Sequence, residues 1–175
     1  MELQILHAIQ GIHQDWLTPI MRFFTTIGEH GLVWIVIAII LACIPKTRKC
    51  GLTMMIAMAI TYLVGNLFLK NVIARPRPCA VDNSVVLKIP FPSEYSFPSG
   101  HSSNGFAGAV TIFCYYRKVG ILSLMMAALI AFSRLYFFVH YPTDILAGMI
   151  LGVVLGIIAA LVASQVKKRR EVSKT

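Results

Sequence analysis

Five long apolar runs, separated by short polar or basic segments, limit most strongly what this chain can fold into. The runs cover residues 31–44, 51–69, 102–116, 119–139 and 143–166. A helix rises about 1.5 Å per residue, so the longer runs can cross the hydrocarbon core of a bilayer, which is about 30 Å thick. Charged residues make up only 13% of the chain, against about 25% in an ordinary soluble domain. The sequence therefore predicts an all-α integral membrane protein, a bundle of five transmembrane helices.

The first 28 residues are less uniformly apolar than the runs that follow. Leu3, Leu6 and Ile9 recur at helical spacing, but polar side chains interrupt them. This pattern is typical of an amphipathic helix that lies at the membrane interface, and a sixth span would arise only if this segment crossed the membrane. We expect one membrane-embedded domain over residues 1–175, with an interfacial segment at 1–28, a helical bundle at 29–166 and a basic tail at 167–175.

The basic residues indicate how the bundle is oriented. Lys and Arg number 16 against 7 Asp and Glu, and most of them lie at 46–49, at 117–118 and in the tail. Five spans place these three segments on one side, which the positive-inside rule makes cytoplasmic. We therefore expect a multi-pass protein of the plasma membrane with a cytoplasmic C-terminus. Clusters at span ends are a topology signal, so we expect no nucleic-acid partner.

Three polar segments, far apart in the sequence, meet at the opposite membrane face in this topology. The candidate residues are Lys70, Arg75 and Arg77 after the second run, Ser99, Gly100 and His101 before the third, and Arg134, His140 and Asp144 around the fourth loop. Arg binds phosphate through two N–H groups, and Lys acts as a point charge. A glycine at a helix start lets backbone N–H groups approach an anion. Lys70, Arg77, Ser99, Gly100 and Arg134 are therefore predicted to bind a phosphoryl group.

His101 and His140 add nucleophilic and acid–base chemistry to this cradle. One histidine can attack phosphorus and form a phosphohistidine, while the other protonates the leaving oxygen and later activates water. Asp144 lies four residues after His140, and Pro142 suits the first position of a helix. The carboxylate of Asp144 can then reach back and fix the tautomer of the ring. We interpret His140 as the nucleophile, Asp144 as its orienting residue and His101 as the general acid.

A metal site is the main chemical alternative for these side chains. His101, His140 and Asp144 could nominally supply three ligands. However, three nearby cations would repel a divalent ion, and few carboxylates lie in these segments. We therefore expect neither a metal nor any other cofactor.

The three segments also carry a family resemblance. Lys-x6-Arg-Pro at 70–78, Pro-Ser-Gly-His at 98–101 and Ser-Arg-x5-His-x3-Asp at 133–144 resemble the signature motifs of the type 2 phosphatidic-acid phosphatase superfamily. This family includes lipid phosphate phosphatases, bacterial undecaprenyl-pyrophosphate phosphatases and soluble vanadium haloperoxidases. The resemblance implies a helical-bundle core, a metal-independent phosphohistidine mechanism and the same roles for the two histidines.

The resemblance favours undecaprenyl pyrophosphate, hydrolysed at the outer membrane face, as the substrate. Phosphatidylglycerol phosphate, phosphatidic acid and diacylglycerol pyrophosphate stay open as substrates. In a different class, the cations alone would suit a non-catalytic anion-binding membrane protein or transporter. A haloperoxidase-like use of the site for vanadate is disfavoured by the membrane spans.

Arg75 and Asn104 each allow two interpretations. Arg75 is either a second substrate contact or a headgroup anchor, and Asn104 either orients His101 or packs between helices. Glu94, in the proline-rich loop, is expected to be solvated. The stripe of glycines at 148, 152 and 156 indicates close helix packing within the bundle first and a homodimer seam second, so the choice between monomer and homodimer stays open.

Overall fold

The computed structural model describes the backbone of residues 1–172 and the side chains of residues 1–166. Its described part is helical, with no strand. The helices are α1 (Glu2–Gln10), α2 (Leu17–Ile27), α3 (Leu32–Cys43), α4 (Arg48–Tyr62), α5 (Lys70–Ile73), α6 (Pro78–Val81), α7 (Gly100–Tyr115), α8 (Arg117–Tyr136) and α9 (Pro142–Val172). A 3₁₀ turn at Glu29–Gly31 joins α2 to α3, and a π-helical stretch at Leu63–Leu69 joins α4 to α5. The all-α prediction is confirmed.

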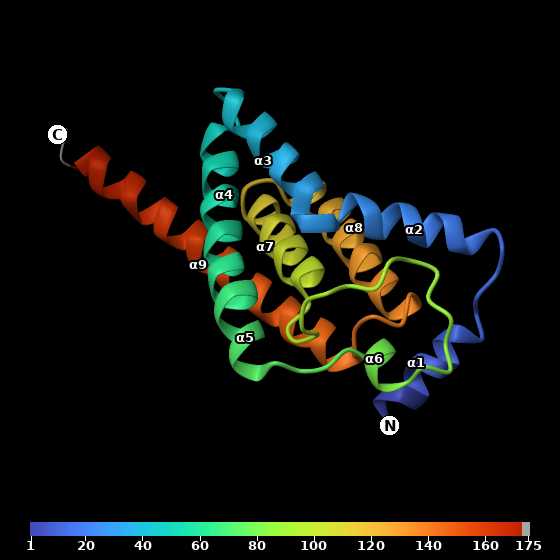
Figure 1. Cartoon of the computed structure of the whole chain (residues 1–175). Helices are drawn as coiled ribbons and strands as arrows, with labels where there is room; N and C mark the ends of the chain where they lie inside the picture. The colour runs from blue at the N-terminus through green and yellow to red at the C-terminus, as the bar shows by residue number, and fades with distance from the viewer. Residues whose placement is uncertain (173–175) are drawn as a thin grey trace.

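Helix α7 lies at the centre of the bundle, between α4, α8 and α9 (Figure 1). Every residue from Ser102 to Ile112 is buried. The helix has 16 residues, which at about 1.5 Å per residue is shorter than the hydrocarbon core of a bilayer. Small residues along α7 allow its three neighbours to approach closely.

The glycine stripe of α9 packs directly on α7. A Cβ atom on Gly152 would lie 2.3 Å from the Ser103 carbonyl oxygen, and one on Gly148 would lie 2.7 Å from that of Ser99. These separations are far below van der Waals contact, so the stripe serves packing inside the bundle. This close packing also sets the start of α9 against the start of α7, where the predicted site residues lie.

Long apolar helices make this a multi-pass membrane protein. Among the described residues, three helical stretches are long and apolar enough to cross a bilayer: Arg48–Val81, Arg117–Tyr136 and Pro142–Val166. The pair Leu17–Ile27 and Glu29–Cys43 would add a fourth if counted as one span bent by 47°. Five spans, or six, therefore stay a prediction.

The N-terminal helices do not lie apart from the bundle. Helix α2 packs along α8, and α1 packs near the end of α8 (Figure 1). The chain bends between α2 and α3 through His30 and Gly31, which have positive φ values of 50° and 71°. The predicted basic tail at 167–175 has its side chains outside the described residues.

Candidate active site

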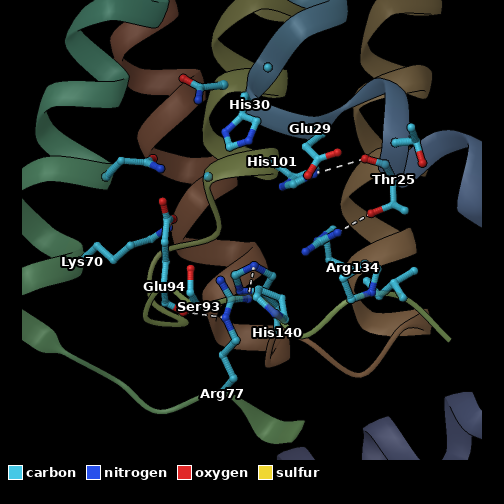
Figure 2. A pocket seen from close by; sticks show the side chains of 18 of the residues that line it. Thr25, Glu29, His30, Lys70, Arg77, Ser93, Glu94, His101, Arg134 and His140 are labelled. Atoms are coloured by element: carbon cyan, nitrogen blue, oxygen red, sulfur yellow. Dashed lines mark hydrogen bonds and ion pairs between the residues drawn. The ribbon is translucent and has the colours of Figure 1, made fainter. Parts of the chain in front are cut away.

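A cavity of about 430 Å³ opens at the end of the bundle where α5 and α8 finish and α7 and α9 begin. The alternation of antiparallel helices brings these four ends together, as the predicted topology requires. Figure 2 shows His101 and Arg134 near Thr25 on one side of the cavity, Lys70 beside Glu94 on another, and His140 next to Arg77. The predicted residues that line it are Lys70, Arg77, Gly100, His101, Arg134 and His140.

His140 lies in the short loop between α8 and α9 and is 2% exposed. The Nη1 group of Arg77 lies 3.1 Å from Nε2 of His140. A guanidinium can only donate, so Nε2 is the acceptor and the ring proton sits on Nδ1. Burial lowers the pKa of His140, and the charges of Arg77 and Arg134 act in the same direction. The ring is therefore neutral at neutral pH, with a lone pair on the nitrogen beside Arg77.

Asp144 lies behind the ring, on the first turn of α9, with Pro142 as the first helical residue. Its Oδ2 atom lies 3.5 Å from Nδ1 of His140. The same oxygen accepts hydrogen bonds from the Tyr141 backbone N–H at 2.8 Å and from the Ser96 hydroxyl at 2.5 Å. The carboxylate thus faces the nitrogen that carries the proton, as an orienting residue must.

His101 lies in the first turn of α7, and helix α2 holds it in place. Its Nε2–H donates to the backbone carbonyl of Thr25 at 3.3 Å, because a carbonyl can only accept. Nδ1 is then the nitrogen that can exchange a proton. Arg134, on the last turn of α8, donates to the hydroxyl of the same Thr25, and its buried Nε has no partner among the described residues. An anion in the cavity would satisfy this donor.

Lys70, at the start of α5, and Arg77, just before α6, also line the cavity, and each is 5% exposed. The ammonium of Lys70 lies 2.5 Å from the Glu94 carboxylate (Figure 2). Arg77 donates to the backbone carbonyls of Glu94 at 2.6 Å and Val139 at 2.8 Å, besides its contact with His140. The loop before α7 and the loop between α8 and α9, which carries His140, therefore fix the buried cations Lys70 and Arg77.

The structure places Ser99 outside the cavity lining. Its hydroxyl caps α7, accepting from the Ser102 N–H at 3.4 Å and from the Ser102 hydroxyl at 3.1 Å. Its own N–H donates to the Asp144 carbonyl at 3.1 Å. The N–H groups of Gly100 and His101, which follow in the first turn, have no acceptor within the helix and remain the backbone donors for an anion.

Several residues of the site fall outside the motifs. Glu94, expected to be solvated, is 58% exposed and in addition pairs with Lys70, because the proline-rich loop folds over the cavity. Thr25 and Ser96 were not predicted, because single polar residues in a helix and a loop give no signal in one sequence. Arg75 does not line the cavity. Asn104 does, and its Oδ1 is buried without a partner among the described residues.

This geometry can bind and attack a phosphoryl group. Three buried cations and the start of α7 surround the space, and preorganised donors of this kind stabilise charge that develops in a transition state. A neutral imidazole offers a nucleophilic nitrogen, and a second imidazole can handle the proton. Among the described residues there is no cluster of three or more His, Cys, Asp or Glu arranged to hold a metal.

Comparison with known proteins agrees with this reading. The model of the PAP2 superfamily matches residues 50–169. An undecaprenyl-diphosphatase of Sulfolobus acidocaldarius is 37% identical over 136 residues, which cover 77% of this chain and 65% of the relative. The undecaprenyl-diphosphatase BcrC of Bacillus subtilis is 30% identical over 157 residues, which cover 86% of this chain and 78% of that protein.

A solved structure shares both the fold and part of the sequence. The PAP2-type phosphatidylglycerolphosphate phosphatase from Bacillus subtilis superposes with a TM-score of 0.75 at 29% identity, covering 93% of this chain and 84% of the other. The family match spans the bundle and all three motif segments. This chain is therefore a membrane phosphatase that belongs to the PAP2 superfamily.

Proposed function

We propose that this phosphatase hydrolyses a lipid phosphate or pyrophosphate through a phosphohistidine on Nε2 of His140. The observation that carries the proposal is the neutral ring of His140, fixed between Asp144 on Nδ1 and Arg77 on Nε2. Nε2 attacks the terminal phosphorus and a P–N bond forms while a P–O bond breaks; the leaving group is the lipid alcohol of a monophosphate or the lipid monophosphate of a pyrophosphate. His101, which enters this step as the imidazolium with a proton on each ring nitrogen, donates its Nδ1 proton to the leaving oxygen. Water, deprotonated by His101, then cleaves the P–N bond and releases inorganic phosphate.

Lys70, Arg77 and Arg134 would hold the non-bridging oxygens in both steps. Charge on these oxygens is spread over the transferring group, so positioning and electrostatic stabilisation supply most of the catalysis. The same three cations would repel a divalent ion. We therefore propose that the reaction needs no metal, and that activity survives chelation by EDTA.

The proposed substrate is a lipid whose headgroup enters the cavity while its tail stays in the bilayer. Ile89, Pro90 and Phe91 line the loop side of the cavity, and Phe91 is 59% exposed. Undecaprenyl pyrophosphate is the leading candidate, because two relatives are named for this activity. The neighbour named for phosphatidylglycerolphosphate keeps that lipid, phosphatidic acid and diacylglycerol pyrophosphate in the test panel.

A substrate panel on the purified protein tests this function. Wild type is expected to release phosphate from at least one polyprenyl or glycerolipid substrate, with or without EDTA, and vanadate should inhibit it. His140→Ala should release none, and acid-labile phosphate should be trapped on wild type only. Undiminished turnover by His140→Ala would refute the mechanism, and phosphate binding without hydrolysis by wild type would favour the non-catalytic alternative.

We also propose that the cavity faces the outside of the plasma membrane. The support is the charge asymmetry: the basic segments at 46–49 and 117–118 lie at the other end of the bundle. Val86, in the loop over the cavity, is 87% exposed. A single cysteine introduced at Val86 should react with an impermeant thiol reagent on whole cells, whereas one at Lys118 should not. The reverse pattern would invert the orientation.

A further inference from the structure

A cluster of three charged residues and one threonine lies directly behind the site, outside the cavity. It consists of Glu2 on α1, Arg75 on the segment between α5 and α6, and Thr143 and Asp144 at the start of α9; we call it the rear cluster. Asp144 is fully buried, whereas the side chains of Glu2 and Arg75 are only 27% and 26% exposed. The proposed mechanism uses Asp144 alone of these residues.

Arg75 is held on three sides. Its Nη1 donates to Oδ1 of Asp144 and to the Thr143 hydroxyl, both at 2.7 Å. Its Nη2 donates to Oε2 of Glu2 at 2.6 Å. The guanidinium also stacks on the ring of Tyr141, 3.8 Å from the ring centroid. Arg75 thus bridges two carboxylates that lie far apart in the sequence, and its outer nitrogens are both engaged.

Glu2 fixes the same point from the other side. Its Oε1 accepts from the Thr143 backbone N–H at 3.1 Å and from the Thr143 hydroxyl at 2.7 Å. A carboxylate at this position satisfies an N–H group in the first turn of α9 and interacts favourably with the helix dipole. Helix α1 is thereby tied to the turn that carries Asp144.

The two oxygens of Asp144 therefore have separate partners. Oδ1 is bound by Arg75, while Oδ2 faces Ser96, the Tyr141 N–H and the ring of His140. A buried carboxylate needs a paired charge and hydrogen bonds to stay ionised and in place. Without Arg75, Oδ1 would lose its cation partner, and only the hydrogen bonds of Oδ2 from Ser96 and the Tyr141 N–H would hold the carboxylate beside His140.

We propose that Arg75 and Glu2 are positioning residues that hold the carboxylate of Asp144 beside Nδ1 of His140. The inference rests on the proposed phosphohistidine mechanism and adds two residues to it. It gives Arg75 a role different from the substrate contact and the headgroup anchor considered from the sequence. It also makes α1, predicted as an interfacial segment, a structural part of the catalytic end of the bundle.

The test compares Arg75→Ala and Glu2→Gln with wild type in steady-state kinetics on the best substrate of the panel. A small displacement of a catalytic group costs about 10- to 100-fold in rate, so we expect a loss of that size in kcat for Arg75→Ala and a smaller one for Glu2→Gln. Neither residue lines the cavity, so KM should stay within about twofold. Arg75→Lys, which keeps the charge and can reach one carboxylate, should recover part of kcat.

A matched control separates this role from general anchoring of α1. His7, on the same helix, contacts Asp82 at 2.7 Å without touching the rear cluster. His7→Ala should leave kcat within about twofold, the usual size of an exposed ion-pair effect. The double variant Glu2→Gln with Arg75→Ala should lose less kcat than the product of the two single losses, because both residues act on the same first turn of α9.

The outcomes are separable from those of the proposed function. If Arg75→Ala keeps the wild-type kcat while His140→Ala is inactive, the positioning role is overturned and the mechanism stands. Equal losses in His7→Ala and Glu2→Gln would also overturn it, since attachment of α1 would then explain both. A rise in KM at constant kcat for Arg75→Ala would return Arg75 to substrate binding.

Discussion

Two cation–carboxylate groups flank His140, and they differ in how firmly each is held. The first, Lys70 with Glu94, faces the cavity; we call it the front pair. The carboxylate of Glu94 is 58% exposed and belongs to the loop between α6 and α7. In the rear cluster, by contrast, Asp144 is fully buried on a helix and bound by Arg75, Ser96 and a backbone N–H.

This difference indicates that Lys70 and Arg75 differ in their availability to a substrate, although both are cations and lie close together in the sequence. A substrate phosphate can replace Glu94 on Lys70, because the carboxylate can turn toward water at little cost. Arg75 cannot accept a substrate in the same way, since both its partners are fixed by helices α1 and α9. Under the proposed mechanism, Arg75 therefore serves structure and Lys70 serves substrate binding.

The largest effect is expected from Asp144→Asn, which breaks the rear cluster at its centre. An amide cannot accept from Arg75, Ser96 and the Tyr141 N–H together while facing the His140 proton, so the tautomer and the ring orientation are both disturbed. In the Ser-His-Asp triad the same change lowers kcat about 10⁴-fold, and we expect a loss of about 10³- to 10⁴-fold here. Steady-state kcat of purified, folded protein measures it. A loss of less than tenfold would contradict the role of Asp144.

The next effect is expected from Lys70→Ala, which breaks the front pair. Removing one preorganised donor to a developing oxyanion costs about 10²- to 10³-fold, so kcat/KM should fall by about 100-fold. Lys88→Ala is the matched control, because Lys88 is exposed and, among the described residues, its side chain has no hydrogen bond or ion pair; its backbone oxygen accepts from Arg22. Adding Glu94→Gln to Lys70→Ala should recover activity severalfold, since an unpaired carboxylate repels phosphate. Equal activity of Lys70→Ala and Lys88→Ala would exclude Lys70 from the phosphate site.

Much of the bundle, and the motif residues that line the cavity, could be predicted from the sequence. The five apolar runs correspond to α3, to α4 with the π-helical stretch Leu63–Leu69, and to α7, α8 and α9, because the hydrophobic period within a helix is a local property. The motif residues Lys70, Arg77, His101, Arg134 and His140 line one cavity because antiparallel helices bring their ends together. Local pattern and helix alternation were sufficient for this part.

The rear cluster and Thr25 could not be predicted in this way. Glu2 and Thr25 lie on short helices whose docking on α8 and α9 depends on tertiary packing rather than on periodicity. Glu94 and Ser96 lie in a proline-rich loop, where composition indicates exposure but not which side chains turn inward. In each case the partner is distant in sequence, so no spacing rule connects the two residues.

A smaller effect is expected from Glu94→Gln alone. The glutamine keeps the shape of the loop but no longer competes as an anion for Lys70, so the phosphate of the substrate meets a free ammonium. A surface-exposed ion pair contributes about 0.2–1 kcal/mol, which corresponds to a KM lowered by at most about fivefold at unchanged kcat. Comparison of KM for wild type and Glu94→Gln measures this. A raised KM would show that Glu94 helps to bind substrate rather than competing with it.

The smallest effect is expected in the pH dependence of stability. The hydrogen bond from Lys70 lowers the pKa of Glu94 below its usual 4.5. A carboxyl group with a lowered folded-state pKa contributes stability that is present above the unfolded pKa and is lost as pH falls through the folded value. Because Glu94 is more than half exposed, this contribution should be less than about 1 kcal/mol.

Wild type should therefore melt slightly above Glu94→Gln between pH 6 and 8, and the difference should shrink as the pH falls below the usual carboxyl pKa of 4.5. The matched control is Asp15→Asn, which removes a carboxylate that has no salt-bridge partner among the described residues. Thermal unfolding in one detergent at several pH values measures both. If the difference between wild type and Glu94→Gln instead persists at low pH, the front pair is held by packing of the loop and Glu94 is not exchangeable. The contrast with the rear cluster would then disappear.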